Sequence, residues 1–182
     1  FLRQEAGEGI LVGRGDEEIG IATDGCTCDA VEFEAAAQAG DDPTALTLYR
    51  GDLLEGFYIQ GAPDAVDWLD GERNRLREVA LRSAWRLASA DSTPPEIALQ
   101  WGRWAANLAP DDESNIGRLI SLLSRHGDRS KAAQVYAEFA RRQGLHDRAI
   151  NTADRTVARH DFTLRYLTPY KPQFTAAAKG QD

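Results

Sequence analysis

The sequence predicts a mainly helical protein built from antiparallel helix pairs, an α-solenoid, with a short β-hairpin near its N-terminus. Three observations support this prediction. Apolar residues recur at helical spacing from Asp29 onward, one segment repeats further along the chain, and two short apolar runs near the N-terminus flank a turn rich in Gly and Asp.

The composition is that of a globular protein with its own hydrophobic core. The chain has 182 residues, of which 42% are hydrophobic and 27% are charged, enough for one ordinary domain or a small domain plus a fragment of another. It contains no apolar run of the roughly 20 residues that a bilayer requires, and no signal-peptide pattern at its start. We therefore expect a cytoplasmic protein with no membrane partner.

The net charge limits how this chain could bind DNA. A formal charge of −8 is unfavourable for a protein that covers nucleic acid with its whole surface. Any contact with DNA should therefore be local.

The N-terminal residues predict a helix followed by a hairpin. Phe1–Ala6 has helical character and is followed by glycines that suit a helix end. The apolar runs Ile10–Val12 and Ile19–Ile21 then flank the turn Gly13–Glu17, a pattern typical of a β-hairpin.

A helix followed by a hairpin is how a winged-helix DNA-binding domain ends. In that interpretation Arg3 lies at the end of the recognition helix and Arg14 at the wing tip, and both are candidates for DNA contact. A wing-tip arginine can contact DNA phosphate or enter the minor groove. The chain has no Met and begins inside the predicted helix, so we expect the rest of a helix-turn-helix to precede Phe1. The alternative is an isolated hairpin that caps a helical domain, which would be marginally stable alone.

Helices are predicted from Asp29 onward. Asp29 is the expected N-cap of the first helix and Thr44 that of the second. A long helix is expected over Asp64–Ala88, with Trp68 and Trp85 beside its apolar stripe. We assign to the buried sides of these helices Val31, Phe33, Ala36, Ala37, Leu69, Leu76, Ala80, Ala84 and Leu87.

An internal repeat follows the break at Ser92–Pro95. Ala98 aligns with Ala132, and Ala106 with Ala140, at an offset of 34 residues, which is the period of tetratricopeptide helix pairs. Gly102 lies where two such helices approach closely. After this repeat the turn Gly144–Asp147 and a further helix over Arg148–His160 are expected, and the segment from Phe162 is irregular.

The sequence lacks the patterns of common catalytic sites. It contains no phosphate-binding glycine loop, no G-x-S-x-G and no H-E-x-x-H. The two cysteines, Cys26 and Cys28, are far in sequence from the histidines, so reduced and partly buried thiols are favoured over a metal site. We predict no enzyme activity, no cofactor and no metal.

Tryptophans and arginines supply the candidate binding residues. The tryptophans Trp68, Trp85, Trp101 and Trp104 are expected to pack in the core. The alternative is that one of Trp101 and Trp104 lines a peptide groove. The arginines on the predicted helices are either solvated charges or a basic patch for an acidic partner. The candidate partner-binding residues are Arg73, Arg77, Trp101, Trp104, Arg141 and Arg142.

Three segments carry a resemblance to a known family. Tyr49–Phe57, Trp68–Arg77 and Ala109–Arg129 resemble the bacterial transcriptional activator domain of antibiotic-regulatory activators. The resemblance implies a wing remnant over 1–25, a tetratricopeptide-like activator domain over 26–161 and an irregular tail over 162–182.

The resemblance also implies a function. In this family a winged helix binds promoter DNA, and the helical domain mediates dimerisation, signal integration or contact with RNA polymerase. The chain would then be a fragment of a transcriptional activator, with promoter DNA and a second protein or a second copy as partners. The alternative is a tetratricopeptide-type adaptor that binds a protein or peptide and never binds DNA; the acidic charge favours it and the hairpin does not.

Overall fold

The computed structural model confirms the predicted mainly helical fold. It describes residues 11–14, 18–22, 27–58, 60–154 and 171. The chain divides into two compact units, an N-terminal unit over Phe1–Ser83 and a C-terminal unit over Ala84–Asp182. No helix in the described part of the chain is both long and apolar enough to span a membrane.

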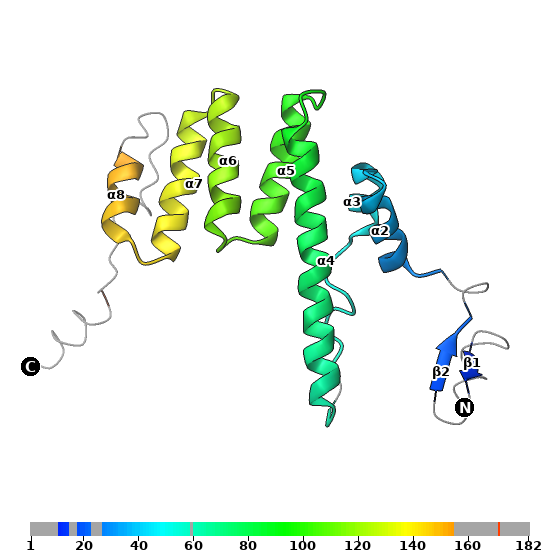
Figure 1. Cartoon of the computed structure of the whole chain (residues 1–182). Coiled ribbons are helices and arrows are strands. Elements are labelled where there is room, and N and C mark those ends of the chain that lie inside the picture. The colour runs from blue at the N-terminus through cyan, green and yellow to red at the C-terminus, as the bar shows by residue number, and fades with distance from the viewer. Residues whose placement is uncertain (1–10, 15–17, 23–26, 59, 155–170, 172–182) are drawn as a thin grey trace, which may run out of the picture. The chain divides into compact units, whose positions relative to one another are not determined.

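The N-terminal unit contains the predicted hairpin. Strand β1 (Leu11–Arg14) pairs antiparallel with β2 (Glu18–Ile21), with Leu11 opposite Ile21 and Arg14 opposite Glu18 (Figure 1). The hairpin prediction is confirmed, whereas the predicted helix over Phe1–Ala6 lies outside the described residues.

Helices α2 (Asp29–Gln38) and α3 (Asp42–Leu48) form a short helix pair. Both N-caps differ from the prediction. The N-cap of α2 is Cys28 rather than Asp29, and the N-cap of α3 is Asp41, whose carboxylate accepts a hydrogen bond from the backbone N–H of Thr44 at 3.3 Å. A carboxylate one position before the helix can reach the unpaired N–H groups of the first turn, so Asp41 displaces Thr44 from this role.

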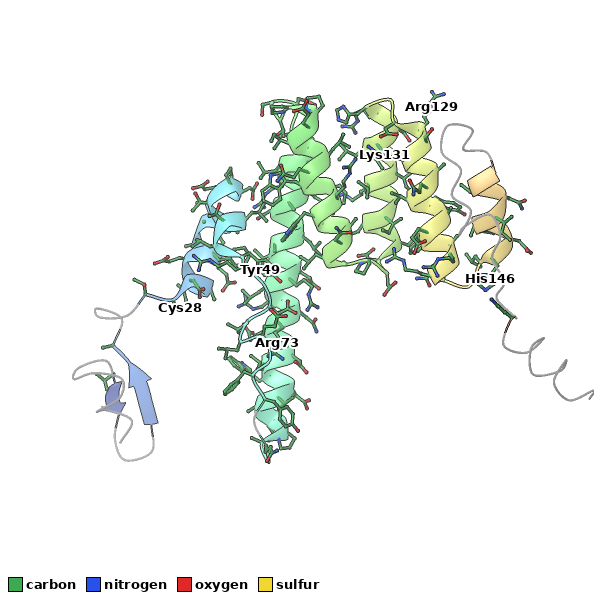
Figure 2. All side chains as sticks on the ribbon, turned by 180° about the vertical axis from the view of Figure 1, so that it is seen from behind. Cys28, Tyr49, Arg73, Arg129, Lys131 and His146 are labelled. Carbon is green, nitrogen blue, oxygen red and sulfur yellow. The ribbon has the colours of Figure 1, made fainter. Side chains whose placement is uncertain are left out.

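The buried face of α2 is narrower than predicted. Phe33 and Ala37 are buried, but Val31 is 64% exposed. Cys28 is also exposed, not partly buried as predicted, and lies just before α2 (Figure 2). Cys26 lies outside the described residues.

The long helix α4 runs from Pro63 to Ser89, one residue beyond the predicted helix at each end. Its stripe is buried as predicted at Leu69, Leu76, Ala80 and Ala84, but at the C-terminal end Ala88 is buried and Leu87 only half-buried. The two tryptophans differ: Trp85 is 3% exposed and Trp68 is 63% exposed. The prediction that Trp68 packs in the core is therefore wrong.

Four helices build the rest of the C-terminal unit. They are α5 (Pro95–Leu108), α6 (Glu113–Arg125), α7 (Arg129–Arg142) and α8 (His146–Asp154), and consecutive helices pack side by side in antiparallel order (Figure 1). Helix α8 begins at His146, so the expected turn is two residues shorter than predicted. The expected end of this helix at His160 lies outside the described residues.

Small side chains make close helix packing possible in this unit. Ala98 and Ala132, which the repeat aligns, are both buried, as are Ala106 and Ala140. A Cβ atom added to Gly102 would lie 2.6 Å from Cδ2 of Leu122, closer than non-bonded carbons approach. The core contains these small residues together with Ile116, Leu119, Leu122 and Leu123.

Candidate functional site

Of the two DNA-binding candidates, Arg14 is among the residues that the structure describes and Arg3 is not. Arg14 is the last residue of β1, and its backbone is opposite Glu18. Arg3 and the turn over 15–17 lie outside the described residues. The predicted DNA contacts of Arg3 and Arg14 therefore stay predictions.

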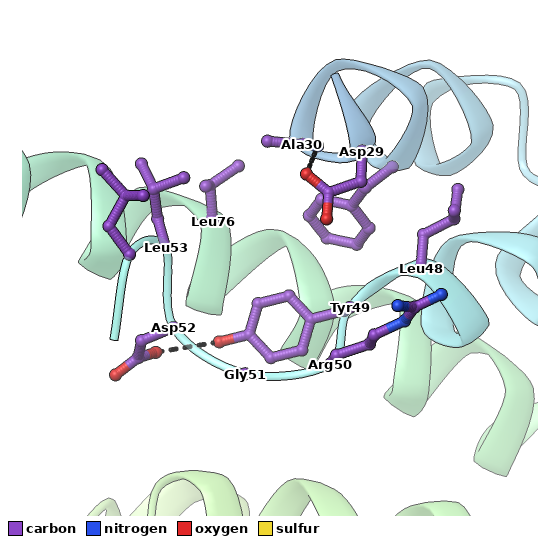
Figure 3. Close-up of a pocket in the computed structure, with 11 residues that line it drawn as sticks. Asp29, Ala30, Leu48, Tyr49, Arg50, Gly51, Asp52, Leu53 and Leu76 are labelled. Atoms are coloured by element: carbon purple, nitrogen blue, oxygen red, sulfur yellow. Dashed lines mark hydrogen bonds between the residues drawn. The ribbon is translucent and has the colours of Figure 1, made fainter. Parts of the chain in front are cut away.

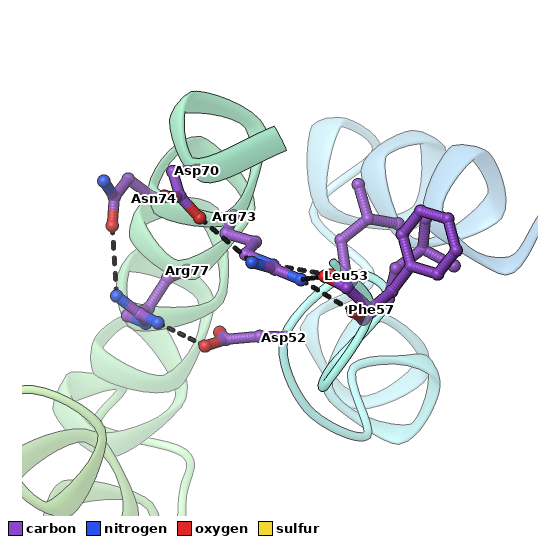
Figure 4. Close-up of polar contacts among 8 residues, drawn as sticks. Asp52, Leu53, Phe57, Asp70, Arg73, Asn74 and Arg77 are labelled. Carbon is purple, nitrogen blue, oxygen red and sulfur yellow. Dashed lines mark hydrogen bonds and ion pairs between the residues drawn. The ribbon is translucent and has the colours of Figure 1, made fainter. Parts of the chain in front are cut away.

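Arg73 on α4 binds the loop that precedes the helix (Figure 4). We call Tyr49–Phe57 the corner. The guanidinium of Arg73 donates to three backbone carbonyls of the corner: Nε to Leu53 at 2.8 Å, and Nη2 to Leu54 at 2.6 Å and to Phe57 at 3.3 Å. Its Nη1 donates to the carboxylate of Asp70 at 2.9 Å. One planar donor group thus satisfies three carbonyls that no helix or strand pairs.

The backbone of the corner is bent in a way that side chains rarely allow. Leu54 has a φ of +49° and Gly56 a φ of +76°. A left-handed conformation costs a leucine roughly 1–2 kcal/mol. The hydrogen bonds from Arg73 offset this cost.

Arg77, one helical turn further along α4, binds the same loop through a side chain. It pairs with the carboxylate of Asp52, and the other oxygen of Asp52 accepts a hydrogen bond from the hydroxyl of Tyr49 at 3.1 Å. Burial and the neighbouring Asp52 carboxylate raise the pKa of Tyr49 to about 12, because both disfavour the phenolate.

A pocket of about 230 Å³ lies beside this network (Figure 3). The ring of Tyr49 lines it together with Phe33 of α2, 5.4 Å away between ring centroids, and with Leu76 of α4. The pocket lies among groups that already contact one another, so it is part of the packing between the corner, α2 and α4.

These contacts give Arg73 and Arg77 a structural role that the sequence did not predict. Both are partner-binding candidates in the sequence, yet the guanidinium of each donates to groups within its own unit. A neighbouring arginine, Arg75, connects α4 to α2 through Glu34, and it also pairs with Glu72 of its own helix at 2.7 Å. Binding of a partner by Arg73 or Arg77 stays a prediction.

In the C-terminal unit a polar network joins α4 to α6. The indole Nε1 of Trp85 donates to Asn115 at 2.6 Å, and the amide of Asn115 donates to Asp112, the N-cap of α6, at 2.9 Å. The guanidinium carbon of Arg118 lies 4.5 Å from the centroid of the Trp85 ring. The buried indole therefore has both a hydrogen-bond acceptor and a cation over its face.

The two tryptophans of α5 contact each other. Trp101 and Trp104 are half-buried, edge to face, with ring centroids 5.8 Å apart. Neither is among the residues that line the hollow formed by α5, α6 and α7, so lining of a peptide groove by either of them stays a prediction.

That hollow is a groove of about 490 Å³, formed by α5, α6 and α7. Apolar side chains of α6 line it, namely Ile116, Leu119 and Leu123. Polar and charged side chains of the two flanking helices also line it: Arg103 and Asn107 of α5, and Lys131, Gln134, Glu138 and Arg142 of α7. The remaining lining residues are Ala106, Pro110 and Val135. We call this hollow the basic groove.

The arginines at the end of α7 differ in their positions. Arg142 is exposed and lines the basic groove, and its binding of a partner stays a prediction. Arg141 pairs with Glu138, and this carboxylate raises the pKa of Arg141. Sequence reasoning missed Arg103 and Asn107, which are four residues apart and therefore share one face of α5.

The fold and these surfaces define a helical-repeat domain with an open groove. The family model described as Bacterial transcriptional activator domain matches residues 28–161, and the chain belongs to this family. It is a family of transcription regulators rather than of enzymes. No curated protein and no solved structure matched the chain.

Proposed function

We propose that this protein is a transcriptional activator whose helical domain contacts a second protein beside a winged-helix DNA-binding domain. The observation that carries the proposal is the family match over residues 28–161 directly after an antiparallel hairpin. A hairpin before this domain has a role as a wing. In a pure adaptor it would have none.

The proposal assigns a role to each part of the chain. Residues 1–25 are the end of the winged helix, 26–161 the activator domain and 162–182 a tail. Because the chain carries a net charge of −8, DNA contact is confined to the wing and the recognition helix, with Arg14 and Arg3 as contacts. The helical domain contacts RNA polymerase or a second copy.

Salt-dependent DNA binding by the complete protein tests this proposal. The expected result is an affinity that falls linearly with salt on logarithmic axes. Arg14→Ala should weaken binding and lower the slope by about one, since one phosphate contact is lost. The control is Arg82→Ala, because Arg82 is an exposed arginine of α4 whose pair with Glu78 is long, at 3.8 Å.

Two results would overturn parts of the proposal. Unchanged binding by Arg14→Ala would remove the wing assignment. Absence of any DNA binding by the complete protein would favour the adaptor instead.

A further inference from the structure

We propose that the basic groove binds an extended acidic peptide segment of the partner protein. The inference rests on the proposed function in one respect: the segment belongs to the protein that the activator contacts. It adds the place of contact and the chemistry of what is bound.

The charges of the groove indicate an anionic ligand. Of the described residues that line it, three are cationic, Arg103, Lys131 and Arg142, and one is a carboxylate, Glu138. Lys131 pairs with Asp128 at 3.1 Å and Glu138 pairs with Arg141, so the two arginines supply the excess positive charge. Neither Arg103 nor Arg142 forms an ion pair with another described residue. The groove is thus locally basic on a chain whose net charge is −8.

The uncharged lining indicates an extended peptide. Asn107 of α5 and Gln134 of α7 both line the groove, and neither forms a hydrogen bond with another described residue. A side-chain amide offers both a donor and an acceptor, which matches the N–H and C=O groups of an extended backbone. The half-buried apolar side chains Pro110 and Val135 would contact small aliphatic side chains of the same peptide, and the arginines would bind its carboxylates bidentately.

Two other occupants fit less well. The segment 155–182 of this chain carries five basic residues and two acidic ones, a net charge of +3, so the cations of the groove would repel it. Single-stranded nucleic acid is anionic, but its binding sites supply aromatic side chains on which bases stack. None of the described residues that line the groove is aromatic.

Fluorescence anisotropy with a labelled short peptide tests the proposal. In the probe, Asp and Glu alternate with Leu and Val. The variant is Arg103→Glu combined with Arg142→Glu, and the matched control is Arg125→Glu combined with Arg148→Glu, which changes the net charge equally at exposed positions outside the groove. Thermal unfolding of both variants checks that they fold.

The expected result is peptide binding that is weakened by salt, and on the order of tenfold or more weaker in the groove variant than in the control. Equal loss in both variants would overturn the proposal, because it would mean non-specific charge attraction. If single-stranded DNA of equal charge binds more tightly than the peptide, and the groove variant loses this binding, the ligand is a nucleic acid and the peptide proposal is overturned. If sedimentation velocity shows self-association that depends on Arg103 and Arg142, the groove binds a second copy of the chain and the peptide proposal is overturned.

The DNA binding of the complete protein separates this proposal from the proposed function. If the groove variant binds the peptide like the wild type while the complete protein binds DNA, the groove proposal fails and the function stands. If peptide binding is lost as expected but the complete protein never binds DNA, the groove stands and the protein is an adaptor.

Discussion

The corner of the N-terminal unit and the repeats of the C-terminal unit are stabilised by different interactions. In the corner, arginines of α4 donate hydrogen bonds to backbone carbonyls and pair with Asp52. In the repeats, alanines and a glycine allow helices to approach closely over a core of leucines. An arginine on a helix of this protein can thus be held by groups of its own unit, as Arg73 is, or be exposed with no ion pair to another described residue, as Arg142 is.

The largest effect is expected from the core of the repeats. Leu123 is 1% exposed, so Leu123→Ala should lower the free energy of unfolding by about 2–5 kcal/mol through lost burial and a new cavity. Ile97→Ala is the control, because Ile97 is 42% exposed. Urea unfolding measures both, and equal losses would contradict the assignment of the core.

The next effect tests close packing in the same unit. A Cβ atom added to Gly117 would meet only open space, so Gly117→Ala should stabilise the protein by up to about 1 kcal/mol through helix propensity. The free energy of unfolding of Gly102→Ala should be about 1–3 kcal/mol lower than that of Gly117→Ala, because the added methyl group would displace the buried side chain of Leu122. Equal unfolding midpoints for the two variants would show that α5 and α6 are less closely packed.

The corner should respond to a change that keeps its charge. Arg73→Lys leaves one ammonium where three carbonyls were bonded, and we expect a loss of about 1–2 kcal/mol in the free energy of unfolding. Arg82→Lys, on the exposed side of the same helix, should be nearly neutral. Chemical denaturation measures the free energy of unfolding of both variants. Equal values for Arg73→Lys and Arg82→Lys would disprove the structural role of Arg73.

The smallest effect concerns pH. The folded protein raises the pKa of Tyr49 from 10.0 to about 12, so the phenol stabilises the fold below pH 10 and this contribution is lost as the pH rises towards 12. Tyr49 is only half-buried, so solvent screening keeps the contribution below about 1 kcal/mol.

Phenolate absorbance of the wild type minus that of Tyr49→Phe isolates this group among the five tyrosines. The difference should have its midpoint near 12. A midpoint near the ordinary value of 10.0 would show that Tyr49 does not face Asp52.

The repeats could be predicted from the sequence because close helix packing requires particular residue types at fixed positions. A buried small residue must recur at each repeat, so Ala98 and Ala132 marked the helix pairs, and Gly102 marked a close approach. The hairpin was predictable for a similar reason, since its turn residues stand between two apolar runs.

The contacts of the corner could not be predicted in this way. The acceptors for Arg73 are backbone carbonyls, which every residue has, so no side chain at Leu53 or Leu54 indicates them. Leu54 also adopts a positive φ that its side chain does not suggest. Trp68 and Trp85 show the same limit, because both lie on α4 and only their neighbours in space decide which is buried.

The basic groove contains one residue that the sequence offered as a binding candidate and one that it did not. Arg142 was identified from its place in a cluster at the end of a helix, whereas Arg103 stands alone in the sequence. Its partners across the groove come from α7, about one repeat later, so only the packing of α5 against α6 and of α6 against α7 brings them together.

Chromatin immunoprecipitation of the complete protein, in the cells that produce it, tests the central claim of a transcriptional activator most directly. A transcriptional activator should enrich discrete sites between genes, and that enrichment should be lost with Arg14→Ala but not with Arg82→Ala. No enrichment of any site by the wild-type protein, despite normal folding and expression, would contradict this claim.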